Sequence, residues 1–365
     1  MKILIQKDKL EDILQNVAGP TLSKQSLPAL SSVLLEAVKN KLKLTTTDLD
    51  TTIIAHLDTN IIKEGKSLIP FKQFFSTIKE LPSKEITIEL TKNNLLIKCE
   101  KIEIEVHTLS VDEFPKITPP RETLLIKINS ADLLSMIRLT SFCVGHEDTS
   151  YVLSGILFEV EKDFIKGVAT DGKRLSFVKR KLSPNQPKIA TKINFILSFR
   201  TVVEIQKVLK DKEEDIHFYV TENKVGFDFK NIQFLTRPIE GEFPPYENHI
   251  PQPQQNKMII NRQTFLAALR RAAVLATSEY QGIKLELKKN MLVIHKITPQ
   301  LGKIKEEIDC VYSGKQFSIG INPYYLIDVL KNIEEAEVSF EFFDVDKPVV
   351  LRTQDYIYLV MPTRV

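Results

Sequence analysis

The chain has 365 residues, of which 43% are hydrophobic and 27% charged, and its formal net charge is +3. This length allows two or three domains with separate cores, and the composition is that of a globular protein. No apolar run approaches membrane-spanning length, and we see no signal peptide at the start, so we expect a cytoplasmic protein that makes no contact with membranes. The charge is too small to indicate nucleic-acid binding by itself.

Three segments share one pattern of a short strand, a polar break and an amphipathic helix: residues 2–17, 124–140 and 257–272. Apolar residues recur in each at positions i, i+3, i+4 and i+7, which predicts one buried stripe per helix. Such internal similarity predicts a tandem repeat. The expected stripes are Leu10, Ile13, Leu14 and Val17; Leu133, Met136, Ile137 and Thr140; and Phe265, Ala268, Leu269 and Ala272.

A second strand-and-helix pattern follows in each third of the chain, at residues 67–81, 194–209 and 317–333. Ser198 and Asn322 are candidate N-caps for two of these helices. Segments of period two, typical of strands, lie between the two helices of each third and after the second helix. The sequence therefore predicts an α+β fold of three similar domains, each built from two strand–helix–strands halves.

The joints between the domains are also visible in the sequence. Residues 117–123 and 250–257 are rich in proline and glutamine and lack a hydrophobic period, as linkers do. We therefore expect three domains, at residues 1–119, 120–250 and 251–365.

One hairpin stands out in the middle third, within "GVATDGKRLSFVKR" (167–180). Residues on both sides alternate in polarity, and Asp171-Gly172 favours a two-residue turn in which both central residues have positive φ. Asp171, Lys173 and Arg174 lie within four positions, so the pattern alone leaves open a catalytic cluster, a phosphate site or a simple turn.

We find no convincing catalytic or cofactor motif. The histidines lack metal-ligand spacing, and the group His146-Glu147-Asp148 is more typical of a polar loop than of a metal site. Cys99, Cys143 and Cys310 are isolated thiols that we expect in the core, without disulfides. Asp48 and Asp171 occupy equivalent turns in two repeats. A hydrolase using this carboxylate pair is conceivable, but equivalent turn residues in repeats are usually structural, so we expect no cofactor and no enzyme.

Basic residues lie on several predicted helices, and non-specific contact with DNA phosphates needs only lysine and arginine. Lys72 and Arg200 begin two of these helices, and Lys24 lies in a polar loop. A solvated helix face explains the same pattern equally well. The sequence has no motif for base-specific recognition.

The whole chain resembles the bacterial sliding clamps, the beta subunit of the replicative DNA polymerase III. The resemblance rests on segments in the family's order from the first domain to the last residue, among them "VAGPTLSKQSLPALSSVLLE", "LTTTDLD", "LSVDEFP", "VATDGKRLSFV", "EGEFPPY", "YSGKQFSIGINPYYLIDVL" and "YLVMPTRV". It implies a head-to-tail homodimer that closes into a ring around duplex DNA, with helices inside and sheets outside. It also implies a processivity factor without an activity of its own, associated with the nucleoid.

The resemblance further implies where partners bind. The replicative polymerase, the clamp loader, other polymerases and repair proteins would dock short peptides in a pocket beside the 167–180 hairpin. Lys173 stands where the family often has histidine, and Asn248, His249 and Ser150 also depart from it at the rim. The implied pocket residues are Leu153, Thr170, Gly172, Lys173, Arg174, Leu175, Pro244, Asn322, Tyr325, Val349, Val360, Met361, Pro362 and Arg364.

By the same resemblance, Lys24, Lys72 and Arg200 would contact DNA. The dimer would form between an edge strand of the first domain, with Ile104 and Val106, and the third domain of the partner, with Val274 and Leu275. The alternation of residues 101–109 independently suits an edge strand with one apolar face. An alternative is a DNA-binding scaffold of the same fold that does not close into a ring.

Overall fold

The structure is a computed structural model that describes residues 1–22, 27–117, 125–145, 150–184, 187, 189, 191–209 and 214–364. The chain forms two compact units by its internal contacts. The first contains Met1–Ala131, Leu182–Lys188 and Arg200–Pro238, and the second contains Asp132–Lys181, Ile189–Phe199 and Ile239–Val365. The middle third of the chain is therefore divided between both units.

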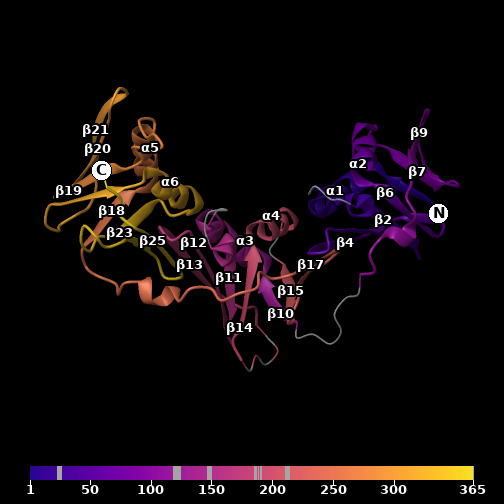
Figure 1. Ribbon diagram of the computed structural model, residues 1–365, viewed down its shortest axis with the longest axis horizontal. Coiled ribbons are helices and arrows are strands. Elements are labelled where there is room, and N and C mark those ends of the chain that lie inside the picture. Colours follow the sequence, from indigo (N-terminus) through magenta and orange to yellow (C-terminus); the bar gives the residue numbers. More distant parts are fainter. Residues whose placement is uncertain are drawn as a thin grey trace. The chain divides into compact units, whose positions relative to one another are not determined.

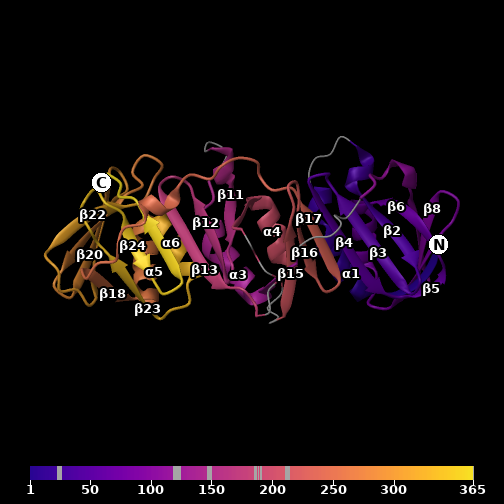
Figure 2. The same cartoon turned by 90° about the horizontal axis from the view of Figure 1, so that it is seen from below.

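Continuous β-sheets account for this division. In the first unit, strands of the middle third extend a sheet of the first third, because β17 pairs antiparallel with β4 from Ile232↔Ala55 to Thr236↔Thr51 (Figure 2). The resulting eight-stranded sheet has the order β10 (Ile126–Asn129), β15 (Asp215–Val220), β16 (Val225–Phe229), β17 (Ile232–Thr236), β4 (Thr51–Asp58), β3 (Lys41–Thr47), β2 (Ser32–Val38), β6 (Gly65–Pro70).

The second unit repeats this plan. Strand β13 pairs with β25 from Arg174↔Val360 to Val178↔Tyr356, which joins the middle third to the last third (Figure 1). The sheet order is β14 (Ile193–Ser198), β11 (Gly155–Val160), β12 (Phe164–Thr170), β13 (Arg174–Lys181), β25 (Tyr356–Val360), β24 (Val349–Arg352), β23 (Glu337–Glu341), β18 (Lys257–Asn261).

Each unit has one further sheet. That of the first unit has five strands in the order β5 (Asn60–Lys63), β1 (Lys2–Gln6), β7 (Glu85–Leu90), β8 (Asn94–Cys99), β9 (Ile102–His107). That of the second has four, in the order β21 (Gly302–Asp309), β20 (Met291–Thr298), β19 (Ile283–Lys288), β22 (Phe317–Ile321). Strands β9 and β21 are edge strands of these sheets.

Six α-helices lie within the described residues, two in each third of the chain: α1 (Lys7–Val17), α2 (Phe71–Glu80), α3 (Ser130–Thr140), α4 (Phe199–Val208), α5 (Arg262–Ala273) and α6 (Pro323–Asn332). Helix α1 packs against α2, and α5 against α6. All twelve residues of the predicted stripes are buried, with Leu10, Met136 and Leu269 fully so. The period of the sequence therefore identified the packed faces correctly.

The Asp171-Gly172 turn differs from the prediction in one respect. Gly172 has φ +83°, but Asp171 does not have positive φ, and β12 and β13 are separated by the three residues 171–173. The Asp171 carboxylate accepts hydrogen bonds from the backbone N–H of Lys173 and Arg174, each at 2.9 Å, so its side chain shapes the turn. The two-residue turn with positive φ at both centres occurs instead at Lys39-Asn40, with φ 48° and 51°.

Candidate functional site

The β12–β13 hairpin is fixed by its own polar side chains. Besides the two bonds to Asp171, the Thr170 hydroxyl donates to the Arg174 carbonyl at 2.6 Å, and the Gly172 N–H donates to the Thr170 hydroxyl at 3.1 Å. Gly172 and Lys173 are exposed, while Leu175 is buried below them. Apart from Gly172 and its two chain neighbours, no atom of the described residues lies within 4 Å of the position that a Cβ on Gly172 would occupy, so the tip of the hairpin faces open space.

Arg174 ties this hairpin to helix α6. The side chain is only 8% exposed, and its guanidinium contacts Asp171 at 3.0 Å and Asp328 at 2.7 Å. Its central carbon also lies 4.5 Å from the ring centroid of Tyr325, a cation–π distance. The resemblance placed Arg174 among the pocket residues. In the structure the guanidinium is occupied by these internal contacts, so Arg174 holds the hairpin and helix α6 together.

The opposite side comes from the last third of the chain. Asn322 caps α6, as predicted, because its side-chain oxygen accepts the Tyr324 N–H at 3.0 Å, and Pro323 follows in the first turn. The Tyr358 hydroxyl donates to the Tyr325 carbonyl at 2.8 Å. The tail continues from β25 beside the hairpin, where the Met361 N–H donates to the Lys173 carbonyl at 2.8 Å.

A connecting segment, residues 239–251, packs on the eight-stranded sheet of this unit through Ile239, Phe243, Tyr246 and Ile250; we call it the strap. Tyr246 from the strap is buried in an apolar cluster with Leu175 and Leu359, and Phe243 packs against the same cluster. The Tyr246 hydroxyl donates to the Glu159 carboxylate at 2.6 Å, and Lys192 pairs with the same carboxylate. Burial, and next the hydrogen bond to Glu159, raise the pKa of Tyr246, so the phenol stays protonated.

The second end of the strap is also anchored. The Arg352 guanidinium donates to the Pro251 carbonyl at 2.7 Å and lies 3.5 Å from Glu341, a residue with 1% exposure that Lys257 approaches to 3.2 Å. Pro244 is therefore presented on a segment that is anchored on both sides.

All the predicted pocket residues lie in the second unit, and they fall into three groups by exposure. The exposed residues are accessible to a ligand, the half-buried residues are partly accessible, and the buried residues pack beneath them. Exposed are Gly172, Lys173, Pro244, Met361 and Arg364; half-buried are Leu153, Thr170, Tyr325 and Pro362; buried are Arg174, Leu175, Asn322, Val349 and Val360.

Sequence reasoning missed Asp328, Glu159 and Tyr246, which position this surface. A signal for Asp328 existed: it follows Tyr325 by three residues on α6, so both side chains lie on one face of that helix. Glu159 gave no comparable signal, because a single glutamate in a strand predicts an exposed position.

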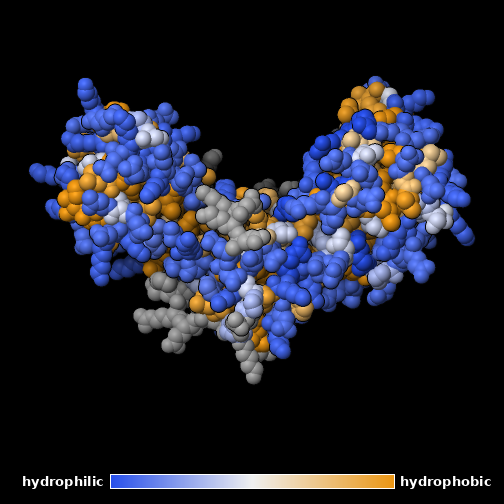
Figure 3. Space-filling model, turned by 180° about the vertical axis from the view of Figure 1, so that it is seen from behind, coloured by the Kyte–Doolittle hydropathy of each residue, from blue (hydrophilic) through white to orange (hydrophobic). Residues whose placement is uncertain are grey.

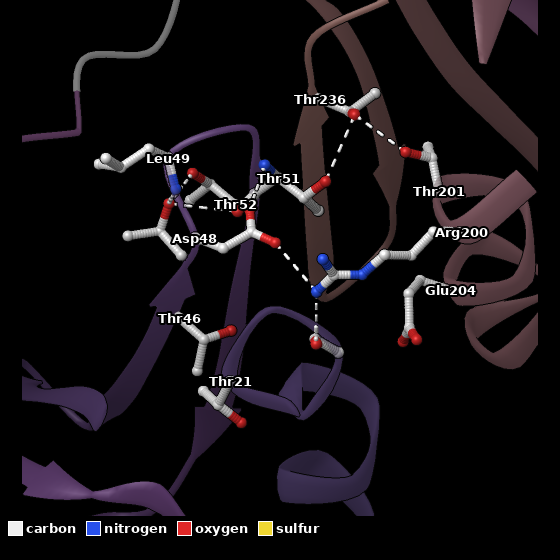
Figure 4. A network of polar contacts seen from close by, with 12 residues as sticks. Thr21, Thr46, Asp48, Leu49, Thr51, Thr52, Arg200, Thr201, Glu204 and Thr236 are labelled. Atoms are coloured by element: carbon white, nitrogen blue, oxygen red, sulfur yellow. Dashed lines mark hydrogen bonds and ion pairs between the residues drawn. The ribbon is translucent and has the colours of Figure 1, made fainter. Parts of the chain in front are cut away.

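The predicted DNA residues have unlike environments. Lys24 lies outside the described residues, as does the His146-Glu147-Asp148 group. Lys72 is exposed in the first turn of α2, and no ion pair involves it within the described part of the chain. Arg200 is half-exposed, but its guanidinium pairs with Asp48 at 3.0 Å and donates to the Gly19 carbonyl at 3.2 Å (Figure 4). Arg200 is thus partly a structural residue.

The Asp48 turn is the counterpart of the Asp171 turn in the first unit. The Thr51 N–H donates to the Asp48 carboxylate at 2.7 Å, and Leu49 has φ 78°, close to the value of Gly172. Threonines surround the turn: the Thr236 hydroxyl lies 3.4 Å from that of Thr51 and 3.2 Å from that of Thr201 (Figure 4). Each aspartate is occupied by its own turn and by an arginine, which argues against a catalytic carboxylate pair.

The predicted interface residues lie at a sheet edge and at a helix end. Strand β9 is an edge strand, as expected, with Val106 buried and Ile104 half-buried. Val274 follows α5 and is 77% exposed, while Leu275 is half-buried. The face seen in Figure 3 is largely hydrophilic, with hydrophobic groups exposed in places. Ile297 and Leu301, at the end of the β20–β21 hairpin, are also exposed.

Other chemistry is not supported. The three cysteines are buried and free, as predicted. Within the described residues, no group of three or more His, Cys, Asp or Glu side chains is placed to hold a metal ion. No helix in the described ranges has the length and apolarity required to cross a bilayer.

Comparison with known proteins identifies the family. Models of the N-terminal, central and C-terminal domains of the DNA polymerase III beta subunit match residues 1–118, 127–245 and 247–364. The chain belongs to the DNA polymerase III beta subunit family. It is 30% identical over 379 residues to the beta sliding clamp of Bacillus subtilis (strain 168), and 28% identical over 370 residues to that of Proteus mirabilis. Each alignment covers 100% of both chains.

Solved structures of sliding clamps agree with this assignment. A sliding clamp from Pseudomonas aeruginosa bound to griselimycin superposes with a TM-score of 0.95 at 28% identity, covering 100% of both chains. One from Bacillus subtilis gives a TM-score of 0.94 at 28% identity, covering 100% of this chain and 99% of that one. The resemblance and the fold predicted from the sequence are confirmed. The chain is a sliding-clamp subunit, a processivity factor without catalytic activity.

Proposed function

We propose that two copies of this clamp subunit close head to tail into a ring around duplex DNA and carry partner proteins along it. The observation that carries the proposal is the full-length match to sliding clamps. In addition, each of the two smaller sheets ends in an edge strand, β9 in the first unit and β21 in the second. Strand β9, with Ile104 and Val106, would meet β21 and the exposed Val274 of a second copy. Domains at 1–119, 120–250 and 251–365 would line the ring, in the cytoplasm at the nucleoid.

A closed ring also reconciles DNA binding with a net charge of only +3. Because a ring cannot leave DNA sideways, it is retained by topology and needs only weak phosphate contacts, which permit sliding. Lys72 is suited to such a contact because it is exposed and has no ion-pair partner among the described residues. Lys24 stays a candidate on sequence alone, and Arg200 would have to share its guanidinium with Asp48.

Partner peptides would bind where the hairpin, the strap and the tail meet. Pro244 and Met361 offer exposed apolar surface there, and the exposed Lys173 and Arg364 offer charge. Short extended ligands with aliphatic or aromatic anchors suit this combination. The partners would be the replicative polymerase, the clamp loader, other polymerases and repair proteins.

The DNA assignment is tested by titrating a DNA duplex at several salt concentrations. Replacing Lys24 and Lys72 with glutamate should weaken binding and lower the log–log salt slope by about one unit per lost contact. The control Lys289→Glu, on the exposed β19–β20 turn of the second unit, makes the same type of charge change. A slope that is unaltered in the double variant, or equally altered in the control, would contradict the assignment.

A further inference from the structure

The strap is the most acidic part of the proposed docking surface. Between Pro238 and Asn256 the sequence has three glutamates, Glu240, Glu242 and Glu247, and neither lysine nor arginine. All three are exposed, and none has an ion-pair partner among the described residues. The strap thus carries uncompensated negative charge within a chain that is positive overall.

Two of these carboxylates directly adjoin residues that anchor the strap. Glu242 immediately precedes Phe243, and Glu247 immediately follows Tyr246, both of which pack on the cluster that contains Leu175. At Gly241 a Cβ would lie 2.6 Å from Val152, so the backbone runs close against the residue before Leu153. Because its neighbours are anchored, the acidic charge cannot move far from Pro244.

Charges on the neighbouring elements do not cancel the strap's charge. Arg174 is neutralised by Asp171 and Asp328. Lys192 is paired with Glu159, and Glu247 contributes only a smaller part of the rise in the pKa of Lys192. Arg352, which donates to the Pro251 carbonyl, lies beside Glu341. The exposed Lys173 and Arg364 are on the hairpin and the tail rather than on the strap.

We propose that this surface selects peptides in which an aliphatic or aromatic anchor is flanked by lysine or arginine on the strap side. The inference rests on the proposed docking function and specifies its ligand chemistry. Exposed ion pairs are individually weak and are screened over about 10 Å at 0.1 M salt. Two or three such pairs give roughly a three- to tenfold higher affinity for a peptide with basic flanking residues than for one with neutral ones, and this difference falls as salt is added.

Fluorescein-labelled peptides that share a Leu-Phe anchor in a Ser-Gly backbone test this preference. Three versions carry arginine, serine or glutamate at the positions on both sides of the anchor, and each is titrated against the full-length protein at low and high salt. The variant Glu242→Lys/Glu247→Lys reverses the charge of the strap. Glu222→Lys, on the exposed β15–β16 turn of the other unit, is the control for a change in overall charge.

The expected order of affinity is arginine, serine, then glutamate, with a spread that narrows at high salt. This order should vanish or reverse in the strap variant and persist in the control. Equal binding of all three peptides, or an unchanged order in the strap variant, would overturn the inference but leave the docking function standing. If none of the peptides bound, the docking function itself would fail, and this inference with it.

Discussion

Arg174 joins two segments from a buried position: its own hairpin through Asp171, and helix α6 through Asp328 and the Tyr325 ring. A buried arginine with two carboxylate partners cannot be trimmed without leaving acidic groups unpaired. Its neighbour Lys173 is exposed, and its side chain has no ion-pair partner among the described residues. Two adjacent residues of the same hairpin thus have opposite roles, one structural and one available to a ligand.

We therefore predict that Arg174→Ala lowers the free energy of unfolding by roughly 2–4 kcal/mol, because Asp328 and Asp171 lose their shared partner. Urea unfolding measures this change. The matched variant Lys173→Ala should stay within about 0.5 kcal/mol of the parent, since it removes only an exposed side chain. Equal stability of the two variants would show that the internal ion pairs contribute nothing.

At the scale of elements, the strap shows how a connecting segment becomes part of a site. Its apolar residues pack on the sheet through Tyr246 and Phe243, and buried carboxylates at Glu159 and Glu341 organise the groups that hold it. Burying a charge is costly unless it is paired, and both carboxylates have a lysine within reach. The strap is therefore a rigid wall rather than a free linker.

Removing one hydroxyl tests this view. Tyr246→Phe keeps the ring in the cluster but deletes the hydrogen bond to Glu159, which is worth about 1.5–3 kcal/mol for a charged acceptor. We expect lower stability in urea and a several-fold loss of affinity for an anchor peptide, with an unchanged dimer in sedimentation. Tyr219→Phe, a half-buried tyrosine in the other unit, is the control. Wild-type peptide affinity in Tyr246→Phe would mean that the strap does not shape the surface.

Local patterns predicted the helices well, because burial at i, i+3, i+4 and i+7 depends only on neighbouring residues. They could not predict contacts between distant residues: Arg174 and Asp328 lie 154 positions apart. The turn geometry was missed because the Asp171 side chain, rather than the Asp-Gly dipeptide, sets it. The resemblance predicted which residues belong to the site. Only the structure shows that Arg174 is buried and supports the hairpin, whereas Lys173 is exposed.

At the scale of the whole molecule, the two eight-stranded sheets explain why a three-part sequence folds as two units. Pairing of β17 with β4 and of β13 with β25 carries each sheet across a boundary between thirds. No local pattern encodes such pairing. The two remaining sheets keep open edges at β9 and β21, which are the edges that the proposed dimer would pair.

Val274→Ala/Leu275→Ala should convert the proposed dimer to folded monomer. Anchors at the centre of an interface each contribute roughly 1–3 kcal/mol, and Val274 is 77% exposed in the single chain, so its loss costs little folding stability. Sedimentation velocity with circular dichroism reports both properties. Val311→Ala, at a site 63% exposed in the same third of the chain, should leave the dimer intact. A dimer that survives the double change would place the interface elsewhere.

Retention on circular and on linear DNA tests the ring most directly. The protein is loaded by its clamp loader with ATP onto a nicked plasmid, and the complex is isolated by gel filtration before and after one restriction cut. A closed ring should stay on the circle at a salt concentration that abolishes phosphate contacts, and should leave through the ends once the plasmid is cut. Equal retention on both forms, or loss from the circle in salt, would contradict topological binding and favour an open scaffold.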